Sequence, residues 1–161
     1  MNASAVVITI STGIVAGQRA DSSGVALRDR LAQFGLTVYD GGIIPDDNLK
    51  IQQAVLRFCD FEPVSLLLFT GGTGPTPDDV TPEAILPLLD RCYEGIENAI
   101  HDDGRSSTPR APMSRLVAGA RGRTVIIALP GSPGACTDAL KTLAPFLMHL
   151  LSLTAGTFDP H

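Results

Sequence analysis

The chain has 161 residues, of which 44% are hydrophobic and 18% are charged, so it can form one globular domain over residues 1–161 with a sizeable core. Its formal net charge of -5 excludes a general attraction to nucleic acid phosphates or anionic lipid, and we expect small-molecule or protein partners. No apolar run approaches the ~20 residues that span a bilayer, the N-terminus lacks the order of a signal peptide, and the three cysteines match no zinc or redox spacing. We therefore expect a soluble, cytoplasmic protein with reduced thiols.

Short, branched apolar runs predict strands that are buried on both faces of a parallel sheet. They are AVVITIST (5–12), VSLLLFT (64–70) and RTVIIAL (123–129), and a further strand is predicted at 36–40. Glycine and then a helix start follow each of the three runs. Alternating strands and helices of this kind predict a single α/β domain with an open, mostly parallel sheet.

Capping residues predict where the helices begin. Asp21 or Ser22 could cap a helix that runs to Phe34, with Gly35 as its stop, and the run PDDN starts a helix over about 48–60. Two later helices show a cap followed by proline: Thr81 with Pro82, and Ser132 with Pro133 before a helix over about 135–153. The loops before these helices converge beyond the carboxyl ends of the strands, where such sheets bind ligands.

The loop after the second apolar run, TGGTGPTPDDVTPEA (70–84), combines backbone freedom with negative charge. Gly71, Gly72 and Gly74 allow a tight turn whose N–H groups point one way, which suits a phosphate or another anion. The spacing matches neither the dinucleotide fingerprint nor the P-loop. A tight strand-to-helix turn without a ligand is the alternative interpretation.

Aspartates beside an anion-binding loop repel the anion unless a cation lies between them. Mg²⁺, held by one or two carboxylates together with substrate phosphates, would resolve this conflict. The candidates are Asp78 and Asp79 in the loop, and Asp46 and Asp47 in another strand-to-helix connection. Asp47 and Asp78 are interpreted as helix caps or as solvated neighbours of Asp46 and Asp79.

The remaining candidates give weaker signals. The three histidines show no catalytic or metal-ligand spacing, and Cys136 near a helix start is interpreted as a small packed residue. Five of the twelve basic residues lie in one segment, where a solvated loop explains them, although they could also face a phosphorylated ligand. The histidines are His101, His149 and His161. The basic residues of the segment are Arg105, Arg110, Arg115, Arg121 and Arg123.

Four motifs in one order resemble the molybdopterin-binding domain family of molybdenum cofactor biosynthesis, of the MogA and MoaB type. They are DSSG, IIPDD, TGGTGPTPDDVTPEA and MSRLVAGARGRTVIIALPGSPGA, and together they extend over essentially the whole chain. The resemblance implies a three-layer α/β sandwich with helices on both faces of the sheet, and usually a homotrimer. Active members transfer AMP from ATP to molybdopterin and release pyrophosphate.

The resemblance also implies roles for particular residues. Asp46 and Asp79 match the two functional aspartates and would hold Mg²⁺ and orient the reacting groups. The glycine loop would line the nucleotide and pterin-phosphate pocket, and two serine-containing segments would lie on the pterin side. The implied substrate-binding residues are Gly71, Gly72, Thr73, Gly74, Ser114, Gly131 and Ser132.

The chain departs from many relatives at three positions. Thr12 stands where many carry an aspartate, and Ser132 and Gly134 stand in a region where many carry asparagine or lysine; Asp46 and Asp79 are unchanged. Molybdopterin adenylyltransferase is therefore the first hypothesis. The alternatives are a paralogue that binds pterin or nucleotide without adenylylating it, and a subunit that mainly contacts other cofactor-pathway proteins.

Overall fold

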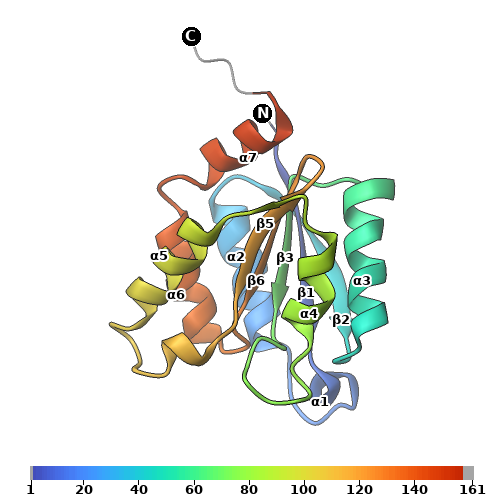
Figure 1. The fold of residues 1–161 in the computed structure, drawn as a ribbon, viewed down its shortest axis with the longest axis vertical. Helices are drawn as coiled ribbons and strands as arrows, with labels where there is room; N and C mark the ends of the chain where they lie inside the picture. The colour runs from blue at the N-terminus through green and yellow to red at the C-terminus, as the bar shows by residue number, and fades with distance from the viewer. Residues whose placement is uncertain (1, 158–161) are drawn as a thin grey trace.

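The computed structural model describes residues 2–157 and contains a six-stranded sheet in the order β2-β1-β3-β6-β5-β4 (Figure 1). Neighbours among β2, β1, β3 and β6 run parallel, whereas β5 is antiparallel to β6 and β4 to β5. The expected mostly parallel α/β sheet is confirmed. The strands are β1 (Ser4–Ile10), β2 (Thr37–Ile44), β3 (Leu66–Thr70), β4 (Arg91–Cys92), β5 (Val117–Arg121) and β6 (Thr124–Leu129).

Helices cover both faces of the sheet and give three layers (Figure 1). Successive side chains of a strand point to opposite faces, so on β3 Leu66 and Leu68 belong to one core and Leu67 and Phe69 to the other. One core is shared with α2 (Ser22–Gln33), α5 (Glu94–Gly104), α6 (Pro133–Leu143) and α7 (Leu147–Ala155), and the other with α3 (Asn48–Leu56) and α4 (Thr81–Ile85). Within residues 2–157, no helix is both long and apolar enough to cross a membrane.

The central strands end level with one another. Thr70 at the end of β3 pairs with Thr9 of β1 and with Leu129 of β6. The loops that follow these three strands therefore leave the sheet at the same edge. Open parallel sheets bind their ligands at this edge, beyond the carboxyl ends of the strands. The first of these loops contains the short helix α1 (Thr12–Val15), which Ser11 caps by accepting a hydrogen bond from the N–H of Ile14.

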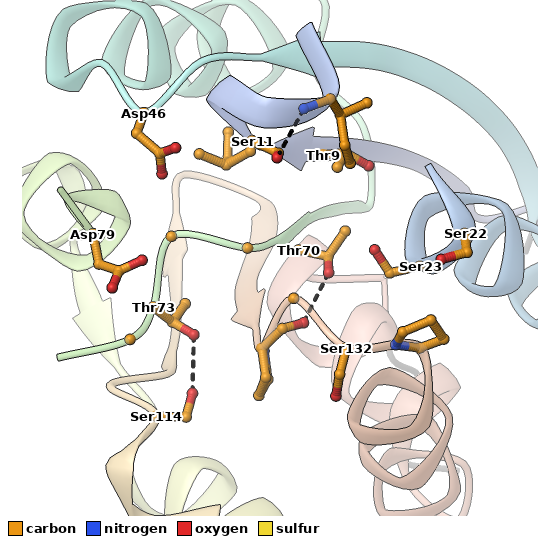
Figure 2. A pocket seen from close by; sticks show the side chains of 18 of the residues that line it. Thr9, Ser11, Ser22, Ser23, Asp46, Thr70, Thr73, Asp79, Ser114 and Ser132 are labelled. Carbon is orange, nitrogen blue, oxygen red and sulfur yellow. Dashed lines mark hydrogen bonds between the residues drawn. The ribbon is translucent and has the colours of Figure 1, made fainter. Parts of the chain in front are cut away.

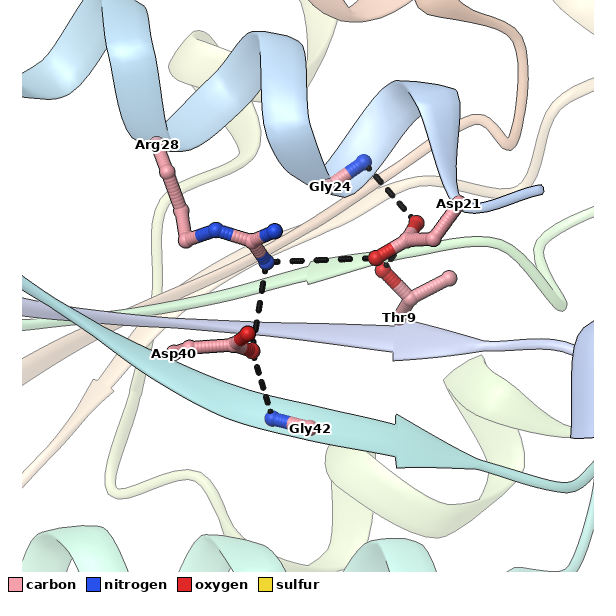
Figure 3. Close-up of polar contacts among 6 residues, drawn as sticks. All are labelled: Thr9, Asp21, Gly24, Arg28, Asp40 and Gly42. Carbon is pink, nitrogen blue, oxygen red and sulfur yellow. Dashed lines mark hydrogen bonds and ion pairs between the residues drawn. The ribbon is translucent and has the colours of Figure 1, made fainter.

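A polar network fixes the start of α2 against the sheet (Figure 3). Asp21 is the N-cap: its carboxylate accepts hydrogen bonds from Gly24 N–H at 3.1 Å and from the Thr9 hydroxyl at 2.8 Å. Arg28, further along the helix, lies 3.8 Å from the Asp21 carboxylate and 3.2 Å from that of Asp40 on β2. The Asp21 cap is thus confirmed, and the network positions the beginning of α2 beside the end of β1.

Three predicted helices differ from the observed ones. The predicted helix 135–153 is interrupted at Ala144–Phe146, because Pro145 has no N–H to continue the ladder. The helix predicted over 48–60 begins as expected, but after Leu56 it widens into a π-helical turn over Arg57–Phe61. Val80, and not Thr81, occupies the N-cap of α4, since the Thr81 hydroxyl instead donates to the carbonyl of Gly71 at 2.9 Å.

Candidate active site

A cavity of about 600 Å³ opens where the loops after β1, β3 and β6 converge (Figure 2). All nine residues that the sequence singled out as catalytic or substrate-binding line it, together with Ser11, Arg19 and the start of α2. The prediction that these distant segments meet in one place is therefore confirmed, whereas their chemical roles stay predictions. The nine are Asp46, Gly71, Gly72, Thr73, Gly74, Asp79, Ser114, Gly131 and Ser132.

The glycine loop, residues 71–74, turns directly out of β3. Gly71 and Gly72 have φ values of 102° and 68°, which a side chain disfavours. A Cβ atom on Gly72 would also overlap the Thr81 hydroxyl oxygen and lie 3.1 Å from the Asp46 carboxylate oxygen Oδ1. Glycine therefore lets the backbone turn sharply and pass close to Asp46.

The loop's carbonyl groups and amide groups have different surroundings. All four carbonyls accept hydrogen bonds: Gly71 from the Thr81 hydroxyl, Gly72 from Thr81 N–H, Thr73 from Arg115 N–H and Gly74 from the Arg115 guanidinium. The amides of residues 72, 73 and 74 donate no hydrogen bond to any group in residues 2–157. Three consecutive N–H donors thus remain available in a cavity, which is the arrangement that binds anions.

The two candidate carboxylates are each anchored by a threonine. Asp46 Oδ2 accepts from the N–H of Thr12 at 3.1 Å and from its hydroxyl at 3.0 Å. Asp79 Oδ2 accepts from the N–H of Thr76 at 3.1 Å and from its hydroxyl at 2.7 Å. Neither Oδ1 accepts a hydrogen bond from the described residues. Figure 2 places both carboxylates beside the glycine loop, Asp46 near Gly72 and Asp79 near Gly74. Each carboxylate therefore has one anchored oxygen and leaves the other for a ligand.

The neighbouring aspartates differ from each other. Asp47 is the N-cap of α3, accepting from Lys50 N–H at 3.0 Å, as predicted. Asp78, which was predicted to be a cap or a solvated neighbour, does not cap α4, because it lies two residues before the observed N-cap; it is exposed, as expected for a solvated neighbour.

Two serines complete the opposite wall. Ser114 and Thr73 share a hydrogen bond of 2.9 Å between their hydroxyl groups, and Ser132 caps α6, accepting from Ala135 N–H at 3.3 Å (Figure 2). A second cavity of about 550 Å³ adjoins this wall and shares Ser114, Pro130 and Ser132 with the first. The two hydroxyl groups therefore stand between two neighbouring spaces.

The segment that contains the five arginines was predicted to be a solvated loop. This prediction is wrong for Arg115 and Arg121, because the side chains of both make hydrogen bonds and ion pairs with other segments. Arg115 ties the glycine loop to α4: it donates to the carbonyls of Gly74 at 2.9 Å and Asp79 at 2.7 Å, and it pairs with Glu83. This hydrogen bond from Arg115 lowers the pKa of the Glu83 carboxyl below its ordinary value. These contacts make Arg115 a support of the loop.

The thiol and histidine interpretations can also be compared with the structure. Cys136 is buried and donates to the Pro130 carbonyl at 3.2 Å, and burial raises the pKa of its thiol to about 11, as expected for a packed residue. His101 contacts the Ser114 carbonyl at 2.7 Å through Nε2 and lines the second cavity. His161 lies outside the described residues.

A metal would need a ligand to complete its coordination here. No group of three or more His, Cys, Asp or Glu side chains in residues 2–157 could hold a metal ion. Asp46 and Asp79 supply two hard oxygen donors beside a loop with three available N–H groups, a set of residues that would suit Mg²⁺ bound together with a phosphate better than an all-protein cage.

Comparison with known proteins identifies the family of the chain. Residues 6–149 match the family model described as "Probable molybdopterin binding domain". Molybdenum cofactor biosynthesis protein B of Escherichia coli K12 is 36% identical over 79% of this chain and 75% of its own, and molybdopterin adenylyltransferase of Helicobacter pylori J99 is 29% identical over 94% and 88%. The chain spans only 22%, 48% and 25% of the length of three longer curated relatives that it also matches. The crystal structure of the molybdopterin biosynthesis enzyme MoaB of Thermus thermophilus superimposes with a TM-score of 0.90 at 38% identity, over 96% of this chain and 97% of that one.

Proposed function

Since the chain belongs to the molybdopterin-binding domain family of molybdenum cofactor biosynthesis, we propose that it is a molybdopterin adenylyltransferase that transfers AMP from ATP to molybdopterin. The observation that carries the proposal is the combination of three available amides on the glycine loop with two anchored carboxylates beside that loop. An anion-binding loop with paired carboxylates suits phosphate chemistry and has little use in a site for neutral ligands.

The reaction would need no nucleophilic side chain. An oxygen of the terminal phosphate of molybdopterin forms a bond to the α-phosphorus of ATP, the bond from that phosphorus to the oxygen bridging to the β-phosphorus breaks, and pyrophosphate leaves. The amides of residues 72–74 would hold phosphate oxygens in place. Positioning and charge stabilisation supply most of the catalysis in such transfers.

We propose that Asp46 and Asp79 hold Mg²⁺ through their free Oδ1 atoms. The ion would neutralise phosphate charge and stabilise the charge that develops in the transition state. Thr12 and Thr76 keep the two carboxylates in position through the other oxygen, Oδ2.

The paired cavities support a two-substrate reaction. A nucleotide and a pterin must lie side by side with their phosphates in contact, and two adjoining spaces of about 600 and 550 Å³ with a shared wall provide that room. Ser114 and Ser132 lie on that wall and would contact the pterin side. We also propose the homotrimer of the family, which light scattering coupled to size-exclusion chromatography would test.

Mass spectrometry of a reaction with molybdopterin, ATP and Mg²⁺ tests the proposal. We expect adenylylated molybdopterin and pyrophosphate, and loss of both in excess chelator or with Asp79→Asn. Asp78→Asn is the matched control, because it removes the adjacent, exposed carboxylate. Pterin binding without product would refute the enzyme in favour of a binding paralogue, and full activity in chelator would refute the role of Mg²⁺.

A further inference from the structure

We propose that Arg19 binds a phosphate group of the ligand in the cavity of the candidate active site; this inference rests on the proposed function. Among the described residues that line that cavity, Arg19 is the only basic one, whereas Asp46 and Asp79 are acidic. A phosphorylated ligand adds negative charge to a wall that already carries two carboxylates. A cation on another part of the lining would offset that charge.

The chain folds back to bring Arg19 to the cavity. Gly17 has a φ of 74°, a left-handed turn just after the α1 segment. A guanidinium nitrogen of Arg19, Nη2, then donates to the hydroxyl oxygen of Ser11 at 3.0 Å. Ser11 is 5% exposed and its hydroxyl oxygen also accepts from Ile14 N–H at 3.2 Å, so it is a fixed support.

The rest of the Arg19 guanidinium is available. Arg28, Arg57, Arg105, Arg115 and Arg121 each pair with a carboxylate, but Arg19 has no acidic partner within residues 2–157. Its single hydrogen bond there uses Nη2, and Nε and Nη1 donate to no other described group. The hydrogen bond to Ser11 uses one of the two N–H groups of Nη2, so the other N–H of Nη2 and that of Nε or Nη1 form a fork that matches two oxygens of one phosphate.

The phosphate could belong to the nucleotide or to the pterin, and binding measurements separate the two. We would titrate Arg19→Gln, Arg19→Lys and wild-type protein with ATP, pyrophosphate, adenosine and molybdopterin in the presence of Mg²⁺. Arg123→Gln is the control, because it removes the same charge from the turn between β5 and β6, at the other end of β6 from the cavity.

We expect Arg19→Gln to weaken the binding of the phosphorylated ligand by about tenfold or more, as removal of a charge-assisted hydrogen bond does. The affinity for adenosine should stay unchanged. Arg19→Lys should fall between, since it keeps the charge and loses the fork. Weaker binding of ATP and pyrophosphate would show that Arg19 contacts the nucleotide phosphates. Weaker binding of molybdopterin would show that it contacts the pterin phosphate.

Unchanged binding of all the phosphorylated ligands, an equal loss in Arg123→Gln, or no binding of them to wild-type protein would each overturn the inference. These results are separate from the adenylyl transfer assay. Wild-type protein that binds ATP through Arg19 but yields no adenylylated pterin would refute the proposed function and leave this inference standing.

Discussion

Replacing the adjacent residues Asp46 and Asp47 in turn separates chemistry from stability. The two carboxylates are identical in type, but Asp46 lines the cavity and Asp47 caps α3. We expect Asp46→Asn to lose activity and keep stability, and Asp47→Ala to do the reverse. Alanine is needed at position 47, because asparagine caps a helix as well as aspartate does.

The structure sets the magnitudes. Loss of the Asp47 cap leaves the N–H of Lys50 without its side-chain partner and should cost about 1 kcal/mol, which lowers the Tm of a domain of this size by about 2–4 °C. In Asp46→Asn the amide oxygen can still accept from Thr12 N–H, so stability should change by less than about 0.5 kcal/mol. Loss of a carboxylate that holds a metal ion should reduce turnover by about 100-fold or more.

The assay pairs product formation by mass spectrometry with calorimetric Tm for both variants. A second measurement, the Mg²⁺ concentration for half-maximal rate, should rise in Asp46→Asn and stay constant in Asp47→Ala. The assignment is wrong if Asp47→Ala loses activity at unchanged Tm while Asp46→Asn remains active.

Three further predictions follow from the loop, the thiols and the Arg115 contacts. Gly72→Ala should unfold at a lower temperature than wild type, because its φ of 68° disfavours a side chain and the new Cβ would overlap the Thr81 hydroxyl. Gly131→Ala, whose Cβ would meet only Gly71 Cα at 3.5 Å, should keep its Tm within about 2 °C and weaken ATP binding; equal Tm values for both variants would contradict the steric argument at Gly72. Iodoacetamide at about pH 8 should modify the exposed Cys92 and spare Cys59 and Cys136, because burial raises the pKa of each buried thiol to about 11; rapid labelling of all three in native protein would disprove this. The Glu83 carboxyl has a lowered pKa in the folded state, so its stabilising effect is present above the ordinary value and is lost as pH falls through the folded pKa; Glu83→Gln should therefore lose less stability than wild type between about pH 5 and pH 3, and identical acid profiles would refute the pair.

Much of the fold could be predicted because its signals are local. The branched apolar runs at β1, β3 and β6 indicate buried parallel strands, and Asp21 and Asp47 cap helices just where the sequence places them. The strand β5 escaped prediction because its sequence VAGAR has small residues in place of branched apolar ones. A Cβ atom on its Gly119 would overlap the Arg91 carbonyl of β4 and lie 2.7 Å from the Leu89 side chain, so close packing and not strand propensity selects that residue.

The residues that line the cavity could be predicted from the sequence, but the residues that hold them in place could not. The glycines and Asp79 occur in one run of sequence, and Asp46 is a candidate from its own strand-to-helix connection. The resemblance to a family selected Asp46 and Asp79 from the four candidate aspartates and added Ser114 and Ser132. Arg115 was predicted as part of a solvated loop, since nothing local shows that its guanidinium reaches carbonyls 36 and 41 residues away. Thr76 could have been found, because a threonine three residues before an aspartate is a common turn pattern.

Thr12 shows why a departure from family sequence must be judged by contacts. Its sequence position is 34 residues from Asp46, yet its hydroxyl donates to the Asp46 carboxylate and accepts from the Asp46 N–H, both at 3.0 Å. An aspartate at this position could supply the same backbone N–H, but its carboxylate could not donate to a second carboxylate. The departure therefore alters how Asp46 is held, because a neutral hydroxyl donor stands where many relatives place a like charge. The same arrangement at Asp79, where Thr76 donates through its amide and hydroxyl, indicates that two neutral anchors, and not neighbouring charges, position the acidic pair in this chain.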